Sequence, residues 1–236
     1  MPHAVARLRA DRLARCVARP PVRGSRIERC GRCRLPAGHC LCALRPRLPS
    51  RSGVCLLMHD VEPLKPTNTG WLVADVVAGT FAFPWSRTEP DARLLALLED
   101  ARWQPYVVFP GAYTDEHRVV RDMCPPAGRL PLFVVLDATW REARRMFRRS
   151  RYLDRWPVLD LPAVRPSRYV LRQARRDQHL CTAEVVARCL LLAGDERASQ
   201  ALDGWLDLFV ARYREALRHG LPSGWNEAGE RLPDSR

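Results

Sequence analysis

The sequence predicts an α/β domain with a mostly parallel sheet flanked by helices. Three short apolar runs, at residues 53–59, 104–109 and 131–136, have the length and β-branched content of strands buried on both faces. Segments with helical spacing of apolar residues, at 71–77, 91–99 and 139–149, alternate with these runs. Alternation of strands and helices is typical of βαβ units, in which the strands run parallel.

Residues 131–149 are the stretch around which the chain is organised. The apolar run ends at Asp137, and Thr139 with Glu142 forms a capping-box pattern that predicts the start of a helix. Ligands of open α/β sheets bind outside the carboxyl ends of the strands, so Asp137, Thr139 and Trp140 are candidate site residues. In the alternative interpretation, Asp137 and Thr139 share the capping of the helix and Trp140 is a packing residue.

A second apolar run ends at His59, and a proline-rich loop follows it. This loop contains Glu62 and leads into Thr67, Asn68 and Thr69. Thr69 is a natural N-cap for the helix over 71–77, and free N–H groups and hydroxyls at a helix start suit a carboxylate or phosphate. A lone histidine at a strand end is more often structural, but its association with Glu62 and the Thr67–Thr69 cluster favours a site.

The remaining elements are shorter. The segments 158–162 and 167–172 read as short strands, and 111–129 reads as a polar loop. Thr182 is the expected cap of a helix with Glu184 in its first turn, and an amphipathic helix covers 201–218. The sequence contains neither Gly-x-Gly-x-x-Gly nor a Walker loop, which argues against a Rossmann dinucleotide site and a P-loop NTPase.

Four cysteines lie within residues 30–42, with the spacing Cys30-x2-Cys33-x6-Cys40-x-Cys42. Two close pairs of thiolates can complete a tetrahedral shell around Zn²⁺, and a shell of four protein ligands makes the metal structural. The first thirty residues lack the apolar core of a secretory signal, and no apolar run is long enough for a membrane span. We therefore expect a cytoplasmic protein with reduced thiols and no membrane contact; free thiols in a loop are the alternative.

The net charge of +13 and the pI near 10.1 point to a polyanionic partner, with nucleic acid first and an acidic membrane second. Because 38 of the 39 basic residues are arginine, codon bias accounts for part of this composition. Residues 1–27 are expected to form a disordered basic arm. Its alternative roles are RNA binding, a transit-like peptide, and a translated extension without a role. The candidate RNA-binding residues on the helix after Asp137 are Arg141, Arg144, Arg145 and Arg148.

Several motifs together resemble the DTW-domain family, the tRNA-uridine aminocarboxypropyltransferases, over residues 28–215. The family's name-giving residues match Asp137, Thr139 and Trp140 in LDATWREARRM. The segment from His59 to Glu62 is similar to its His-Pro-x-Glu motif, with Asp60 in place of proline. Thr182 and Glu184 match a Ser-Thr-x-Glu motif, with Cys181 in place of serine.

The resemblance implies a SPOUT-like fold, a knotted C-terminal segment being an option. Together with the cysteine spacing and the polar C-terminus, we expect a four-cysteine zinc module at 28–49, a DTW catalytic domain at 50–220 and a disordered tail at 221–236. The resemblance also implies transfer of the 3-amino-3-carboxypropyl (acp) group from S-adenosylmethionine to N3 of a tRNA uridine, with release of methylthioadenosine. No obligate protein partner is evident.

In this reaction a base should remove the N3 proton, and Asp137 at the strand end is the candidate. The donor-binding set expected from the resemblance and the strand ends is His59, Glu62, Thr67, Asn68, Thr69, Thr139, Trp140, Arg172, Thr182 and Glu184. Within it, the Thr67–Thr69 cluster or Arg172 would hold the methionine carboxylate, and Glu62 or Glu184 the amino group. The rival functions are a SPOUT-type RNA methyltransferase and a non-catalytic zinc-containing RNA-binding protein.

Overall fold

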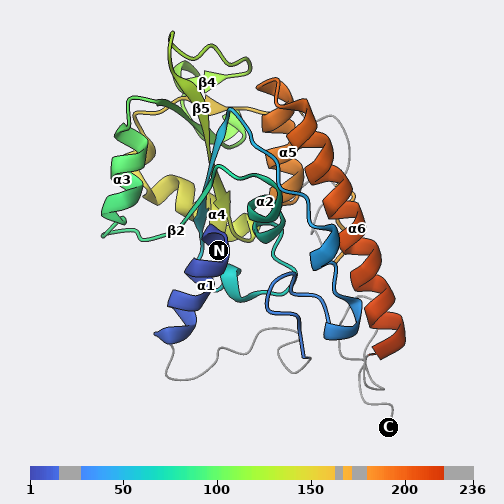
Figure 1. Ribbon diagram of the computed structural model, residues 1–236. Helices are drawn as coiled ribbons and strands as arrows, with labels where there is room; N and C mark the ends of the chain where they lie inside the picture. The colour runs from blue at the N-terminus through green and yellow to red at the C-terminus, as the bar shows by residue number, and fades with distance from the viewer. Residues whose placement is uncertain (16–27, 163–166, 172–179, 221–236) are drawn as a thin grey trace.

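Six parallel strands form the sheet in the computed structural model, which describes residues 1–15, 28–162, 167–171 and 180–220 (Figure 1). Within these residues the strand order is β2-β1-β5-β3-β6-β4. The strands are β1 (Gly53–Met58), β2 (Thr80–Pro84), β3 (Trp103–Val108), β4 (Val119–Val120), β5 (Leu130–Asp137) and β6 (Val158–Leu159). The expected α/β class with a parallel sheet flanked by helices is confirmed.

Strand β5 lies at the centre of the sheet because its apolar run can be buried on both faces. It pairs with β1 on one side, where Met58 lies beside Asp137, and with β3 on the other, where Val108 lies beside Val135. The chain passes from β1 outward to β2 and then crosses to β3 on the far side of β5. The carboxyl ends of β1 and β5 therefore flank a switch in strand order, where α/β sheets bind ligands.

Helices cover both faces of the sheet. The first face packs against α2 (Gly70–Val76), α5 (Thr182–Leu192) and α6 (Glu196–Gly220), and Figure 1 shows α5 and α6 side by side. The second face packs against α3 (Ala92–Glu99) and α4 (Trp140–Arg149). Alternate residues of β5 serve the two cores: Phe133 lies in the first and Leu132 in the second, both with no exposed surface.

The expectation of a disordered arm is wrong for its first half. Residues Ala4–Ala14 form helix α1, in which Val5 and Leu8 are buried against the first core. His3 caps the helix by accepting a hydrogen bond from the Ala6 N–H, and Arg12 makes two hydrogen bonds to the Asp60 carboxylate, of 2.6 and 2.8 Å. The helix has a short apolar stripe between its arginines, and this stripe packs against residues that are distant in the sequence.

Four further expectations need correction. Residues 167–171 form no strand and are held by side-chain contacts instead, while the 111–129 loop contains the two-residue strand β4. The last helix begins at Glu196, five residues before the expected start. The cap of α5 is Cys181, not Thr182.

Some expectations lie outside the described residues. They concern the arm at 16–27, the tail at 221–236 and Arg172. The knotted C-terminal segment stays a prediction, because residues 163–166 and 172–179 also lie outside the described residues. Within the described part of the chain, no helix has both the length and the apolar character that crossing a membrane requires.

Candidate active site

Asp137 is the last residue of β5 and is only 2% exposed. Its backbone carbonyl accepts a 3.0 Å hydrogen bond from the N–H of His59, so the ends of β5 and β1 are joined directly. The preceding strand residues are buried and apolar, and the next two lead into the cap of α4. The fold thus delivers a carboxylate to the carboxyl edge of the sheet, as the sequence predicts.

Hydrogen bonds from Asn68 and Thr182 hold the Asp137 carboxylate. Asn68 donates to Oδ2 through Nδ2 at 2.8 Å, and the Thr182 hydroxyl donates to Oδ1 at 2.8 Å. These residues come from the N-terminal ends of α2 and α5, which converge on the strand end from the first face of the sheet. Thr182 is therefore a partner of the acid and not the helix cap that the sequence suggested.

Gly70, the first residue of α2, is a site residue that the sequence analysis missed. A Cβ atom at this position would lie 2.3 Å from Asp137 Oδ2, which is far closer than any non-bonded contact allows. A side chain here would push the carboxylate away from Asn68 and Thr182. Glycine is thus required by the close approach of the helix backbone to the carboxylate, and not by its own dihedral angles.

Asn68 links this carboxylate to a second one. Its Nδ2 also lies 3.2 Å from Oε2 of Glu62, and its Oδ1 accepts a 2.9 Å hydrogen bond from the backbone N–H of Trp71. Asn68 therefore caps α2 through its side chain, a role that the sequence analysis gave to Thr69. Glu62 has no exposed surface and forms an ion pair with Lys65, the only lysine of the chain.

The predicted residues on the other face of the sheet form a separate layer. His59 stacks on Trp85 at 6.1 Å between ring centroids, and its Nδ1 lies 3.5 Å from Oε1 of Glu142. Burial opposes ionisation of Glu142, but hydrogen bonds from Thr139 and the nearby His59 and Lys65 outweigh it and lower the pKa of Glu142. The capping box of Thr139 and Glu142 is confirmed, and it also aims Glu142 at His59.

Trp140 lies in the same layer and is half-buried. Its indole stacks on Phe109 with ring centroids 5.4 Å apart and planes inclined by 12°. Phe109 directly follows β3, so residues from the ends of three neighbouring strands meet at this edge. The contact with Phe109 therefore agrees with the packing alternative for Trp140.

The remaining predicted residues brace the site. The Thr67 carbonyl accepts a 2.6 Å hydrogen bond from the Tyr169 hydroxyl, and Thr69 Oγ1 lies 3.4 Å from the N–H of Ala183. Glu184 accepts hydrogen bonds from the Ser167 hydroxyl and from the backbone N–H groups of Arg168 and Cys181. Both Glu184 oxygens are thus engaged by the protein, and this residue anchors segment 167–171 beside α5.

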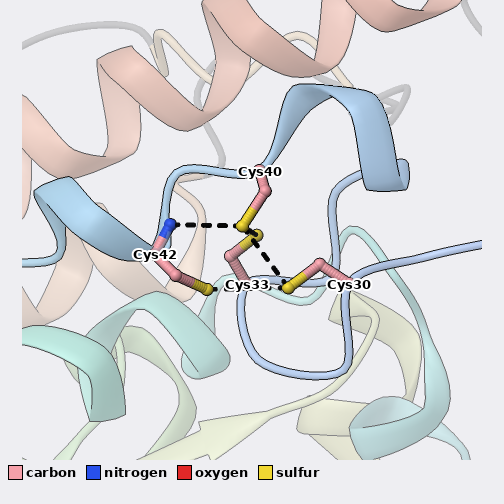
Figure 2. A group of neighbouring side chains, drawn as sticks. All are labelled: Cys30, Cys33, Cys40 and Cys42. Atoms are coloured by element: carbon pink, nitrogen blue, oxygen red, sulfur yellow. Dashed lines mark hydrogen bonds between the residues drawn. The ribbon is translucent and has the colours of Figure 1, made fainter.

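The four predicted cysteines converge on one point from two turns (Figure 2). Their sulfur atoms lie within 4.8 Å of one another, with Cys30–Cys42, Cys33–Cys40 and Cys30–Cys40 separations of 3.6, 3.8 and 3.5 Å. A tetrahedral Zn²⁺ with bonds of about 2.3 Å needs sulfur atoms about 3.8 Å apart, so these thiols fit the ion. Burial would raise the pKa of Cys30, but the backbone N–H groups of Cys33 and Arg32 and neighbouring thiols lower it to about 6.

The cysteine cluster supports α2. The Trp71 indole donates a 2.9 Å hydrogen bond to the Arg32 carbonyl, and the Arg34 guanidinium lies 5.1 Å from the centre of the Trp71 ring. Leu35 and Leu41 are buried in the first core. Since α2 begins shortly after Asn68, with Gly70 against Asp137, an ordered cysteine loop helps to position the carboxylate.

Helix α4 presents a basic surface next to the site. All four predicted RNA-binding residues, Arg141, Arg144, Arg145 and Arg148, are exposed. In the described part of the chain none of them pairs with an acidic side chain, whereas Arg93, Arg102, Arg155 and Arg168 on other elements do. Their charge is therefore available to a polyanion.

Comparison with known proteins gives the family of the chain. The family model described as "DTW domain" matches residues 27–214. The chain is similar to "tRNA-uridine aminocarboxypropyltransferase 2" of Drosophila melanogaster, with 27% identity over 182 residues that cover 73% of this chain and 68% of the relative. No solved structure gives a significant match. With the Asp-x-Thr-Trp turn at the sheet edge and the family model covering most of its length, the chain belongs to the DTW-domain family.

Proposed function

We propose that this protein transfers the 3-amino-3-carboxypropyl group of S-adenosylmethionine to N3 of a uridine in tRNA. The observation that carries this proposal is the buried Asp137 carboxylate, held by Asn68 and Thr182 at the switch point of the sheet. Membership of the DTW-domain family and the name of the relative support the same reaction.

The bond changes are simple. Uridine N3 attacks the γ-methylene carbon of the methionine chain, the bond from that carbon to the sulfonium breaks, and neutral methylthioadenosine leaves. The N3 proton must go to a base, because N3 is protonated at neutral pH. Since the sulfonium is already a good leaving group, the protein contributes mainly the base and the alignment of N3 with the correct carbon.

We assign the final proton acceptor to Asp137 and a relay to Thr182. Asp137 is almost fully buried, whereas Thr182 is half-buried and donates its hydroxyl proton to Oδ1. The hydroxyl can accept the N3 proton as its own proton passes to Oδ1, which leaves Thr182 unchanged and Asp137 protonated. The carboxylate would also lie favourably near the sulfonium charge before transfer.

The methionine end of the donor would lie on the first face of the sheet. Glu62 is the candidate partner for the amino group, and Lys65 with the Thr67–Thr69 segment for the carboxylate. Lys65 is partly exposed next to buried Glu62, so its ammonium can reach a ligand without leaving this acid. Thr139 and Trp140 would form the wall toward the adenosine, where the indole offers a cation–π surface to the sulfonium. His59 and Arg172 remain proposed donor contacts.

The tRNA would lie across α4, where four exposed arginines have no acidic partner among the residues that the structure describes. Contacts to phosphates should make binding strongly dependent on salt. The four-cysteine loop would hold Zn²⁺ through Cys30, Cys33, Cys40 and Cys42. When bound, this ion supplies structural cross-linking of the loop, since four thiolates leave no open coordination position.

The test is nucleoside mass spectrometry of tRNA transcripts incubated with purified protein and S-adenosylmethionine. The proposal predicts a new acp-uridine, together with methylthioadenosine in the supernatant. A methylated uridine with S-adenosylhomocysteine would instead identify a methyltransferase. Unchanged tRNA that still binds the protein would identify a non-catalytic RNA-binding protein.

A further inference from the structure

A cluster of aromatic side chains extends outward from Trp140. Phe109 stacks on Phe147 at 4.4 Å between centroids and on Trp140 at 5.4 Å. Tyr113 meets both Phe109 and Trp140 edge to face, at 5.5 and 5.7 Å. The inner rings belong to the second core or pack against it, so they fix the position of Tyr113 at the surface.

Tyr113 is the outer member of this cluster and is 38% exposed, although its ring packs against Phe109 and Trp140. The Arg144 guanidinium lies over it, with Cζ 4.8 Å from the ring centre. No acidic side chain among the described residues pairs with Arg144, so none of them neutralises its charge. Unstacked nucleobases stack on aromatic rings and on guanidinium planes, and this surface holds one of each side by side.

The location of this pair relates it to the proposed chemistry. Val108 of β3 lies beside Val135 of β5, so the residues after β3 reach the same edge of the sheet as Asp137. Trp140 contacts Tyr113 and follows Asp137 by three residues, placing the aromatic pair on the α4 side of the carboxylate. The Asn68 and Thr182 contacts to Asp137 lie on the opposite side of the sheet, where the methionine end of the donor is proposed to bind.

We propose that Tyr113 and Arg144 form a stacking platform for a nucleobase adjacent to the target uridine; this inference rests on the proposed tRNA function. Presentation of uridine N3 requires an unstacked base, and its displaced neighbour then needs a new stacking partner. The ring supplies the surface and the guanidinium supplies both a planar stacking group and attraction to the nearby phosphate. Stacking alone does not select a base, so the platform fixes the position of the strand and not its sequence.

The experiment compares two fluorescein-labelled probes of equal phosphate charge: a single-stranded RNA of about ten uridines and an abasic strand of the same length. Fluorescence anisotropy with the full chain gives a dissociation constant for each. The wild-type protein should bind the uridine strand between about 5- and 100-fold more tightly than the abasic strand. A wild-type protein without this preference would overturn the platform.

The variants separate stacking from charge. Tyr113→Ala should reduce the base preference by about fivefold or more, whereas Tyr113→Phe keeps the ring and should stay within about twofold. Arg144→Lys keeps the charge but loses the planar group, so affinity for the abasic strand should be retained while the base preference falls. Arg102→Lys is the matched control, because Arg102 lies over Trp103 at 6.0 Å near the start of β3, at the opposite end of the sheet.

A Tyr113→Ala protein with the wild-type melting temperature and an unchanged base preference would refute the platform. Acp-uridine formation by the wild-type protein is measured separately on tRNA transcripts. Its absence would refute the proposed function, whereas its presence together with an unchanged preference in Tyr113→Ala would refute only the platform. Binding that depends on charge alone, with equal affinity for the two strands, would likewise refute the platform.

Discussion

Replacement of Asp137 by asparagine tests the proposed base with little disturbance of the fold. The side chain keeps its size, which matters because Gly70 leaves no room around Oδ2. If the new amide oxygen faces Asn68, it can still accept the 2.8 Å hydrogen bond from Nδ2. The new NH2 group then faces Thr182, whose hydroxyl can turn to accept instead of donate.

Both of these hydrogen bonds therefore survive in Asp137→Asn, and their contribution to the unfolding free energy should change by less than about 1 kcal/mol. Alanine is a poorer choice, because it removes the acceptor from both donors. Each buried donor left without a partner costs about 1–3 kcal/mol, a large part of the total stability of a domain. Loss of activity in Asp137→Ala could therefore come either from the missing base or from unfolding, and the assay would not separate the two.

The expected effect of Asp137→Asn on turnover is a fall of about 100- to 10,000-fold, which corresponds to about 3 to 5 kcal/mol of activation free energy. The assay is release of methylthioadenosine with saturating S-adenosylmethionine and tRNA, followed by chromatography. Asp100→Asn, at the opposite end of the sheet before β3, is the matched control and should keep wild-type turnover. A folded Asp137→Asn protein within about threefold of wild type would refute the assignment of the base.

Three further predictions concern the relay, the metal and the N-terminal helix. Thr182→Ser keeps the hydroxyl and should retain turnover, whereas Thr182→Val should lose about 100-fold; equal rates for the two in the methylthioadenosine assay would exclude a relay. Cys33→Ser removes one of four zinc ligands, so bound zinc by elemental analysis and the melting temperature should both fall; an undiminished zinc content would contradict the cluster. Burial, with nearby arginines, lowers the pKa of His3 to about 4, and burial raises that of Asp75, 3.5 Å away, to about 7. Between these pKa values His3 is protonated only in the unfolded chain, which makes stability rise with pH, and Asp75 only in the folded chain, which makes stability fall with pH. The two effects cancel in the wild-type protein. In His3→Asn only the effect of Asp75 remains, so stability should fall as pH rises from 4 to 7, by at most about 1.4 kcal/mol per pH unit. Urea titrations across this range test it, and a slope equal to that of wild type would contradict it.

The sheet was predictable where a strand is buried on both faces. The runs ending at His59 and Asp137 are continuous and apolar, and the capping box at Thr139 marks the next helix, so the sequence locates the edge that carries the candidate site. Strand β2 was missed because Thr80–Pro84 lies at the edge of the sheet, is only partly buried and ends in proline. Helix α1 was missed because its stability depends on partners far away in the chain.

The partners within the site were less predictable than its location. Asn68, Thr69 and Thr182 all look like helix caps in the sequence, and only the convergence of α2 and α5 decides which side chain caps and which contacts Asp137. Gly70 and Tyr113 carry no local motif that signals their roles. Both roles arise from contacts across the sheet edge, which the spacing of residues along the chain does not encode.

The most direct test of the account uses S-adenosylmethionine labelled either in the carboxyl carbon of its methionine chain or in its methyl group. Each form is incubated with purified protein and tRNA transcripts, and the label in the washed tRNA is counted. The account predicts that the carboxyl label enters uridine, in equal amount to methylthioadenosine released, while the methyl label stays in solution. Entry of the methyl label into tRNA without the carboxyl label would contradict it.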